Sequence, residues 1–334
     1  MGLLVDGKWH DQWYETKNTG GRFVRKEAQF RDRVTEDGSS GFKAESGRYH
    51  LYVSLACPWA HRTLIYRQLK GLEDHISVSV VNPLMLENGW TFDEAPGVIP
   101  DTVNGARCLY EVYTAARSDY SGRVTVPILW DKETATIVNN ESSEIIRMFD
   151  HEFDSVGATG PVYCPPDLRP DIDEMNAFVY NAINNGVYRA GFATTQKAYD
   201  EAVRSLFAAL DQIELVLSSF RYLTGDTLTE TDWRLFTTLV RFDPVYVGHF
   251  KCNLRRVVDS RNLWDYTREL YQVPGVAETV NVDHIKTHYY RSHPTINPTR
   301  VVPTGPEIDF EAPHGREALG AARSGDATSA VVRL

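Results

Sequence analysis

The stretch that decides the fold is YHLYVSLACPWAHRTLIYRQLKGL, Tyr49–Leu72, which predicts a strand leading through a cysteine into a helix. Apolar and more polar residues alternate from Tyr49 to Ser54, as in a buried strand. A helical pattern begins at Pro58, and proline is well tolerated at a first helical position. Cys57 therefore lies at a helix N-terminus, where unpaired N–H groups and the helix dipole favour the reactive thiolate.

The position that would hold a second cysteine in a dithiol redox motif is Ala60. Because no resolving thiol is built in, an oxidised or adducted Cys57 needs an external thiol to regenerate it. A free cysteine is commonly just a small buried hydrophobic residue. The strand–Cys–Pro–helix setting favours a functional role instead.

Composition restricts the class of protein. The length of 334 residues suggests two domains, and 42% hydrophobic with 24% charged residues is ordinary for a globular enzyme. A net charge of −10 argues against a general binder of nucleic acids or anionic membranes. The N-terminus lacks a long apolar run, so we expect neither a signal peptide nor a membrane span. Four cysteines without paired spacing fit a reducing, cytoplasmic location.

The elements after the cysteine helix complete a recognisable order. We expect strands at 76–81, 123–130 and 134–139 and a helix that opens at Glu141. The first strand–helix–strand unit should pair in parallel with a right-handed crossover. The order βαβ…ββα predicts an α/β thioredoxin-like domain with a mixed sheet. Pro127 cannot donate to a ladder, so it belongs at an edge, a bulge or a turn, and a cis bond there would direct backbone toward Cys57.

The whole chain divides into five predicted parts. An irregular N-terminal arm (1–45) carries the aromatic residues Trp9, Trp13, Phe23 and Phe30, so we expect it to pack on the body or on a partner subunit. The other parts are the thioredoxin-like domain (46–154), a linker rich in Gly and Pro (155–170), an all-helical domain (171–293) and an extended tail (294–334) whose last fifteen or so residues are expected to be disordered. Helices are expected roughly at 171–190, 196–219, 230–242, 262–272 and 276–291, the third capped by Thr229 and Asp232.

This architecture resembles the glutathione transferase superfamily, with its thioredoxin-like and all-helical halves. A Cys-Pro pair alone is weak, because omega-class enzymes share it. The combination is similar to one branch, the glutathionyl-hydroquinone reductases or Xi-class glutathione transferases, over nearly the whole chain. The motifs that carry the resemblance are Ala56–Arg62 (ACPWAHR), Asn82-Pro83, Gly89-Trp90 and His288–His293 (HYYRSH).

The resemblance implies a role for each matching residue. Cys57 is the nucleophile, and tyrosines surround the hydroquinone and the thiolate; these are Tyr188, Tyr246 and either Tyr289 or Tyr290, of which we favour Tyr289. The positions that match glutathione-binding residues are Trp90, Arg123, Val124, Val126, Glu141 and Ser142.

The chemistry of glutathione fits most of these roles. Glu141 can pair with the ammonium group, and Ser142 with its helix N-terminus can hold the γ-glutamyl carboxylate. Arg123 suits the other carboxylate, and the backbone beside Pro127 can pair with the cysteinyl amide. The same residues also have simpler interpretations: Glu141 and Ser142 suit helix capping, and Trp90 and the tyrosines suit core packing.

The resemblance implies reduction of glutathionyl-hydroquinones to hydroquinones through a Cys57–glutathione mixed disulfide, with release of oxidised glutathione. It implies glutathione as co-substrate, no metal, no nucleic-acid or membrane partner, and a homodimer.

Three other readings compete with this one. An omega-like thiol transferase or dehydroascorbate reductase would use the same Cys57 chemistry on smaller substrates. A non-catalytic binding protein of the same fold would have an inert Cys57. A metal-binding protein could use His284, His288 and His293, although no carboxylate motif or cysteine accompanies them.

Overall fold

The computed structural model describes residues 2–321 and divides them into two compact units. The first unit contains the residues up to Tyr14, then Arg25–Pro161 and Glu278–Val302. The second contains Glu15–Val24, Val162–Ala277 and the residues from Pro303 onward. The sequence pattern placed residues 278–293 in the helical domain, whereas their contacts group them with the first unit.

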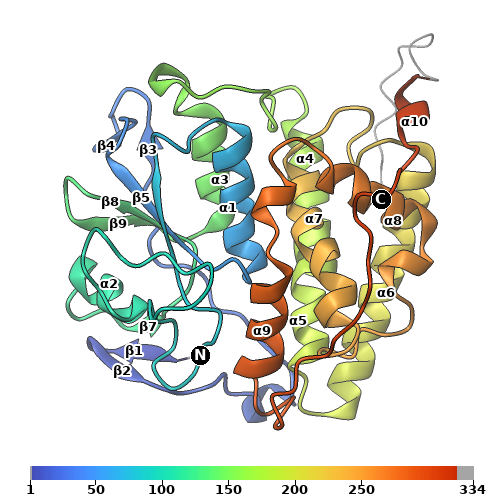
Figure 1. The fold of residues 1–334 in the computed structure, drawn as a ribbon, viewed down its shortest axis with the longest axis horizontal. Helices are drawn as coiled ribbons and strands as arrows, with labels where there is room; N and C mark the ends of the chain where they lie inside the picture. The colour runs from blue at the N-terminus through green and yellow to red at the C-terminus, as the bar shows by residue number, and fades with distance from the viewer. Residues whose placement is uncertain (1, 322–334) are drawn as a thin grey trace. The chain divides into compact units, whose positions relative to one another are not determined.

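The first unit is built on a four-stranded mixed sheet of order β6-β5-β8-β9. The fully buried strand β5 (Tyr49–Val53) pairs in parallel with β6 (Ser77–Val80) and antiparallel with β8 (Ile128–Asp131), which forms a hairpin with β9 (Thr136–Asn139). Helices α1 (Pro58–Leu69) and α3 (Ser142–His151) lie side by side (Figure 1). The predicted thioredoxin-like order, with its parallel crossover and its hairpin, is confirmed.

Two expectations for this unit were wrong. The expected strand 123–130 is interrupted, because Pro127 has no N–H to give to a ladder: β7 (Gly122–Arg123) ends before it and β8 begins after it. The N-terminal arm is not wholly irregular, since β1 (Leu3–Val5) and β2 (Lys8–His10) form a sheet of order β2-β1-β7. The expected packing of the arm on the body is confirmed by that pairing.

The first unit contains two further strands and two further α-helices. They are β3 (Val34–Thr35), which pairs in parallel with β4 (Phe42–Lys43), then α2 (Leu109–Ala116) and α9 (Val282–Ser292).

The second unit is helical, as expected. Its helices are α4 (Arg169–Phe178), α5 (Asn185–Gly191), α6 (Gln196–Ser219), α7 (Glu230–Arg241), α8 (Arg261–Tyr271) and the short α10 (Glu317–Ala321). The expected helix 171–190 is divided by a π-helical turn at Val179–Asn184, and a second such turn, Phe242–Tyr246, follows α7. Among the helices of the described residues, none is both long enough and apolar enough to cross a membrane.

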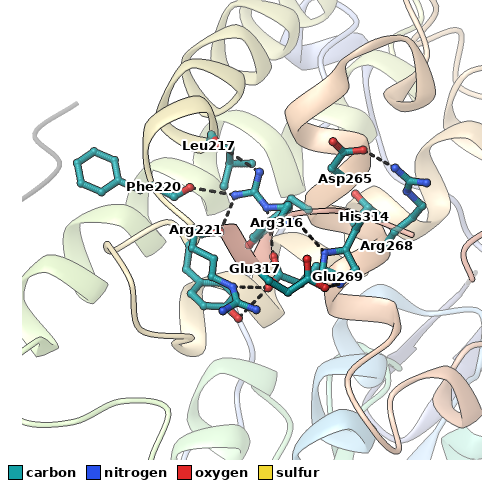
Figure 2. Close-up of polar contacts among 12 residues, drawn as sticks. Leu217, Phe220, Arg221, Asp265, Arg268, Glu269, His314, Arg316 and Glu317 are labelled. Atoms are coloured by element: carbon teal, nitrogen blue, oxygen red, sulfur yellow. Dashed lines mark hydrogen bonds and ion pairs between the residues drawn. The ribbon is translucent and has the colours of Figure 1, made fainter. Parts of the chain in front are cut away.

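The C-terminal tail of the second unit is anchored by one buried arginine, Arg316 (Figure 2). Its guanidinium donates to Glu269 and to the carbonyl oxygens of Leu217, Phe220 and Arg221, at and just beyond the end of α6. Between Pro303 and Asp309 the tail forms neither a helix nor a strand. The predicted disorder of the last fifteen or so residues concerns positions that lie almost entirely outside the described range.

Candidate functional site

Cys57 occupies the N-cap position of α1, as the sequence predicts. Its backbone is extended (φ −79°, ψ 121°), Pro58 is the first helical residue, and the Cys57 carbonyl accepts the first helical hydrogen bond from His61 N at 2.9 Å. Its thiol is half-buried, whereas Cys108, Cys164 and Cys252 are buried. Cys57 is therefore the cysteine that combines access with a helix N-terminus.

The segment between β7 and β8 brings backbone to this thiol. The Val126–Pro127 peptide bond is cis, and the Val126 carbonyl oxygen lies 3.8 Å from Cys57 Sγ. Val124 and Val126 are buried, and the Tyr113 hydroxyl donates to the Thr125 carbonyl oxygen at 2.9 Å. The structure therefore confirms the expected turn of backbone toward Cys57 at Pro127.

Glu141 and Ser142 open α3. Glu141 is the N-cap residue, and its carboxylate accepts from the backbone N–H and the hydroxyl of Ser143, at 3.1 and 2.9 Å. Ser142 is the first helical residue and is 2% exposed. Helix capping is thus one demonstrated function of Glu141, and the carboxylate is held at the end of the helix where N–H groups are available to an anion.

A buried arginine lies beside this helix start. Arg62 of α1 donates from Nη1 to Ser142 Oγ at 3.4 Å, and its guanidinium lies 4.6 Å from the centroid of the Trp59 ring. The guanidinium of the exposed Arg25 also stacks on Trp59, at 4.2 Å. Arg62 of the Cys57 helix is therefore in direct contact with Ser142, one of the predicted glutathione positions.

Trp90 is buried, so the plainer core-packing interpretation holds for most of its surface. Its ring stacks on His288 of α9 with centroids 4.7 Å apart and planes 23° apart. His288 Nδ1 is 3.0 Å from the Pro83 carbonyl oxygen, which fixes the imidazole. The structure thus joins three parts of the resemblance motifs, Pro83, Trp90 and His288.

The tyrosines at the end of α9 differ in burial. Tyr289 is buried and packs against His288 and His293, with ring centroids 5.3 and 5.8 Å apart. Tyr290 is only partly buried.

The metal-binding alternative finds no support in the described part of the chain. Residues 2–321 contain no group of three or more His, Cys, Asp or Glu side chains that could hold a metal ion. His284 Nε2 lies 2.6 Å from the Pro96 carbonyl oxygen, and His288 is bonded to Pro83.

Arg123 contacts the N-terminal arm. Its guanidinium donates to the carbonyl oxygens of Gln12 and Trp13 and lies 4.1 Å from the centroid of the Tyr14 ring. Burial lowers the pKa of Arg123. Arg123 therefore orders residues 12–14, a function that the sequence did not suggest.

In the second unit, Tyr188 and Tyr246 meet. Their rings are in an edge-to-face contact at 6.2 Å, and Tyr246 stacks on Phe250 at 5.4 Å. Tyr188 is half-buried on α5, while Tyr246 is fully buried at the end of the second π-helical turn. Phe23, from the arm segment Glu15–Val24 of this unit, packs against Phe192 and Tyr188.

Sequence reasoning missed Arg62, His288 and Phe23 as members of these clusters. Arg62 and His288 lie inside the quoted motifs, yet their contacts join residues about 80 and 200 positions apart, and no local pattern reports such contacts. Phe23 carried a signal, because it is one of the large aromatics that predicted a packed arm.

Comparison with known proteins places the chain in a family. The family models described as "Glutathione S-transferase, N-terminal domain" and "Glutathione S-transferase, C-terminal domain" match residues 56–152 and 196–269. The chain is 60% identical over 324 residues to the glutathionyl-hydroquinone reductase YqjG of Escherichia coli, covering 95% of this chain and 99% of that protein.

Solved structures agree with this placement. The glutathione-bound structure of YqjG from Escherichia coli K-12 matches with a TM-score of 0.88 and 57% identity, covering 95% of this chain and 99% of that one. The Xi-class glutathione transferase of Natrialba magadii matches with a TM-score of 0.89 and 52% identity, covering 95% and 97%. The chain thus belongs to the glutathione transferase superfamily, and within it to the Xi class.

Proposed function

We propose that this protein reduces glutathionyl-hydroquinones to hydroquinones with glutathione as the co-substrate. The observation that carries the proposal is the half-buried Cys57 at the N-cap of α1, beside the Val126 carbonyl, in a chain 60% identical to a glutathionyl-hydroquinone reductase. Glutathione is the bound ligand of a matching structure, which supports the same co-substrate here.

In the first step, the Cys57 thiolate attacks the sulfur of the glutathionyl thioether. The new S–S bond forms the Cys57–glutathione mixed disulfide as the bond between sulfur and the aromatic carbon breaks. The electron pair of that bond goes to the carbon, which must gain a proton, and a tyrosine hydroxyl is a suitable acid. Tyr188, Tyr246 and Tyr289 are the residues to which we assign the protonation and the stabilisation of the thiolate.

In the second step, a free glutathione thiolate attacks the glutathione sulfur of the mixed disulfide. Oxidised glutathione leaves and Cys57 returns to the thiolate. This intermolecular step is needed because Ala60 stands where a second cysteine would resolve the disulfide. Residue by residue, we assign glutathione binding to Trp90, Arg123, Val124, Val126, Pro127, Glu141 and Ser142.

The decisive experiment omits free glutathione, so that the reaction stops after its first step. The protein is incubated with a glutathionyl-hydroquinone and weighed intact, with Cys57→Ser and, as a matched cysteine control, Cys108→Ser. We expect a glutathionyl adduct and released hydroquinone for the wild type and for Cys108→Ser, and neither product for Cys57→Ser.

The absence of both adduct and hydroquinone from the wild type would overturn the reductase proposal. An adduct that forms equally in Cys57→Ser would instead overturn the assignment of the nucleophile. Turnover of a generic mixed disulfide far above that of the hydroquinone substrate would point to an omega-like thiol transferase.

The proposal also covers metal content, oligomeric state, cellular location and domain division. We propose a metal-free homodimer in the cytoplasm, with the five-part division of the chain given above except that residues 278–293 group with the thioredoxin-like domain. The four cysteines are free thiols in the structure, which supports a reducing compartment. Light scattering of the purified protein tests the dimer, and elemental analysis tests for a bound metal.

A further inference from the structure

The buried guanidinium of Arg62 reaches the start of α3 from α1. Helices α1 and α3 lie side by side (Figure 1). Arg62 is 1% exposed, and its Nη1 lies 3.4 Å from Ser142 Oγ. The guanidinium carbon of Arg62 lies over the Trp59 ring, 4.6 Å from its centroid, in a cation–π contact.

The direction of this hydrogen bond follows from the chemistry of the two groups. A guanidinium has donors and no acceptor, whereas a hydroxyl has one donor and two acceptor positions. Ser142 Oγ therefore accepts from Arg62, and its own hydrogen must point to another acceptor. The Arg62 charge and the N-terminal end of α3 add positive potential at the same place.

An anionic ligand at this place would meet a donor that is already oriented. The carboxylate of the neighbouring Glu141 accepts from the backbone N–H and the hydroxyl of Ser143. A carboxylate accepts from hydroxyl and backbone N–H groups at a helix start.

We propose that Arg62 is a positioning residue that orients the Ser142 hydroxyl and supplies the positive charge for recognition of the γ-glutamyl α-carboxylate. This deepens the proposed function and rests on its assignment of Ser142 to glutathione binding. Arg62 acts through Ser142 and through its field.

The experiment measures binding of two ligands by calorimetry, without turnover. One ligand is glutathione, and the other is 4-aminobutanoyl-cysteinylglycine, which keeps the amine, the thiol and the glycyl carboxylate but lacks the α-carboxylate. The proteins are the wild type, Arg62→Met, Arg62→Lys and, as the matched control, Arg25→Met, which removes the other guanidinium from Trp59 without touching Ser142.

We expect Arg62→Met to weaken glutathione binding by about tenfold to a hundredfold, the usual value of a charged hydrogen bond, while binding of the analogue changes little. Arg62→Lys should recover part of the loss, because the charge remains without the planar fork. Arg25→Met should bind both ligands as the wild type does.

Equal weakening of both ligands by Arg62→Met would show a merely structural role, and unchanged glutathione binding would also overturn the proposal. If Arg62→Met fails to fold, Arg62→Lys decides: its loss must be confined to glutathione. Because no turnover is needed, a failure of the reductase reaction with a ligand-specific Arg62 effect would refute the proposed function alone. A working reductase reaction without a ligand-specific effect of Arg62→Met would refute this inference alone.

Discussion

At the scale of single residues, the four cysteines differ in the property that decides their chemistry. Burial raises the pKa of the Cys108 and Cys252 thiols, and Cys164 is also buried. Cys57 is half-buried at a helix N-terminus, where a thiolate is favoured. Selective reactivity at one position follows from this contrast.

We therefore predict that a short treatment of the native protein with iodoacetamide places its carbamidomethyl group on Cys57, because only an accessible thiolate reacts quickly. Peptide mapping by mass spectrometry locates the label. The three buried cysteines should be labelled after unfolding in guanidinium. Labelling of Cys252 as fast as Cys57 in the native protein would contradict the burial argument.

The site also shows which features can be predicted from local sequence and which cannot. Glu141 and Ser142 could be placed at a helix start because a cap is a pattern of adjacent residues. The contact of Arg62 with Ser142 could not be placed, because it depends on how α1 and α3 pack across 80 positions of chain. Arg123 shows the same limit, since the arm carbonyls that it binds lie about 110 positions away.

At the scale of elements, α7 has the cap that its sequence predicts. Thr229 N donates to Asp232 Oδ2 at 2.8 Å, and the buried carboxylate also accepts from Leu223 N and the Tyr266 hydroxyl. The cap thus joins the helix start to α8.

We predict that Thr229→Ala lowers the free energy of unfolding by about 1–2 kcal/mol, the cost of removing an N-cap hydroxyl. Urea unfolding followed by circular dichroism measures the change. The matched control is Thr195→Ala, at the exposed cap of α6, where Thr195 Oγ1 accepts from Ala198 N at 3.3 Å. That loss should be about 0.5 kcal/mol, the low end for caps. Equal losses of unfolding free energy at the two caps would show that burial does not strengthen the cap at Thr229.

Other elements were predictable in proportion to their regularity. The 24-residue α6 has its predicted bounds, because a long amphipathic pattern with an N-cap is a strong local signal. The strands of the arm span only two or three residues. Their pairing with β7 or with one another determines their extended conformation more than their own composition does. The first π-helical turn arises inside an apparently continuous helical pattern, so periodicity alone could not show it, and the second extends beyond the predicted end of its helix at 242.

The tail anchor leads to a prediction for the second unit. Arg316 caps the end of α6 through three carbonyl oxygens and pairs with Glu269, which also binds Arg221 (Figure 2). We predict that Arg316→Met lowers the free energy of unfolding by about 2–4 kcal/mol, because it leaves buried polar groups without a donor. Thermal and urea unfolding measure the loss.

A matched arginine tests whether the loss comes from burial. The side chain of Arg261 is 90% exposed, and its Nε lies 4.0 Å from Asp265 Oδ2. Arg261→Met should lower the free energy of unfolding by no more than about 0.5 kcal/mol. A small loss for Arg316→Met would show that the tail is dispensable for the stability of the second unit.

At the scale of the whole molecule, each unit contains a buried histidine whose pKa is lowered by burial, His50 in the first and His249 in the second. His50 lies in β5 between the hydroxyls of Ser77 and Ser79, at 2.7 and 2.9 Å, and burial lowers its pKa to about 4. Burial likewise lowers the pKa of His249, in the second unit, to about 4. Both units should therefore respond to acid in the range where an unfolded histidine gains a proton.

The sign of the His50 effect follows from its two pKa values. Between pH 6.5 and 4 the unfolded chain binds a proton that folded His50 refuses, so the stability present above pH 6.5 is lost as the pH falls. The largest slope is about 1.4 kcal/mol for each pH unit. Nearby Asp101 opposes the shift, while Lys132 and Arg67 add to it.

Other groups titrate in the same range: burial raises the pKa of Asp232 to about 6, and protonation of this carboxyl changes the stability in the opposite direction. His50→Gln keeps a polar side chain between the two serines but cannot titrate. We expect the wild type to be more stable than His50→Gln at pH 7 and to lose that advantage progressively toward pH 4.5, in urea titrations at each pH. A stability difference that stays constant with pH would mean that folded His50 gains its proton as readily as the unfolded chain does, and the strand pairing of β5 with β6 would then tolerate a buried imidazolium.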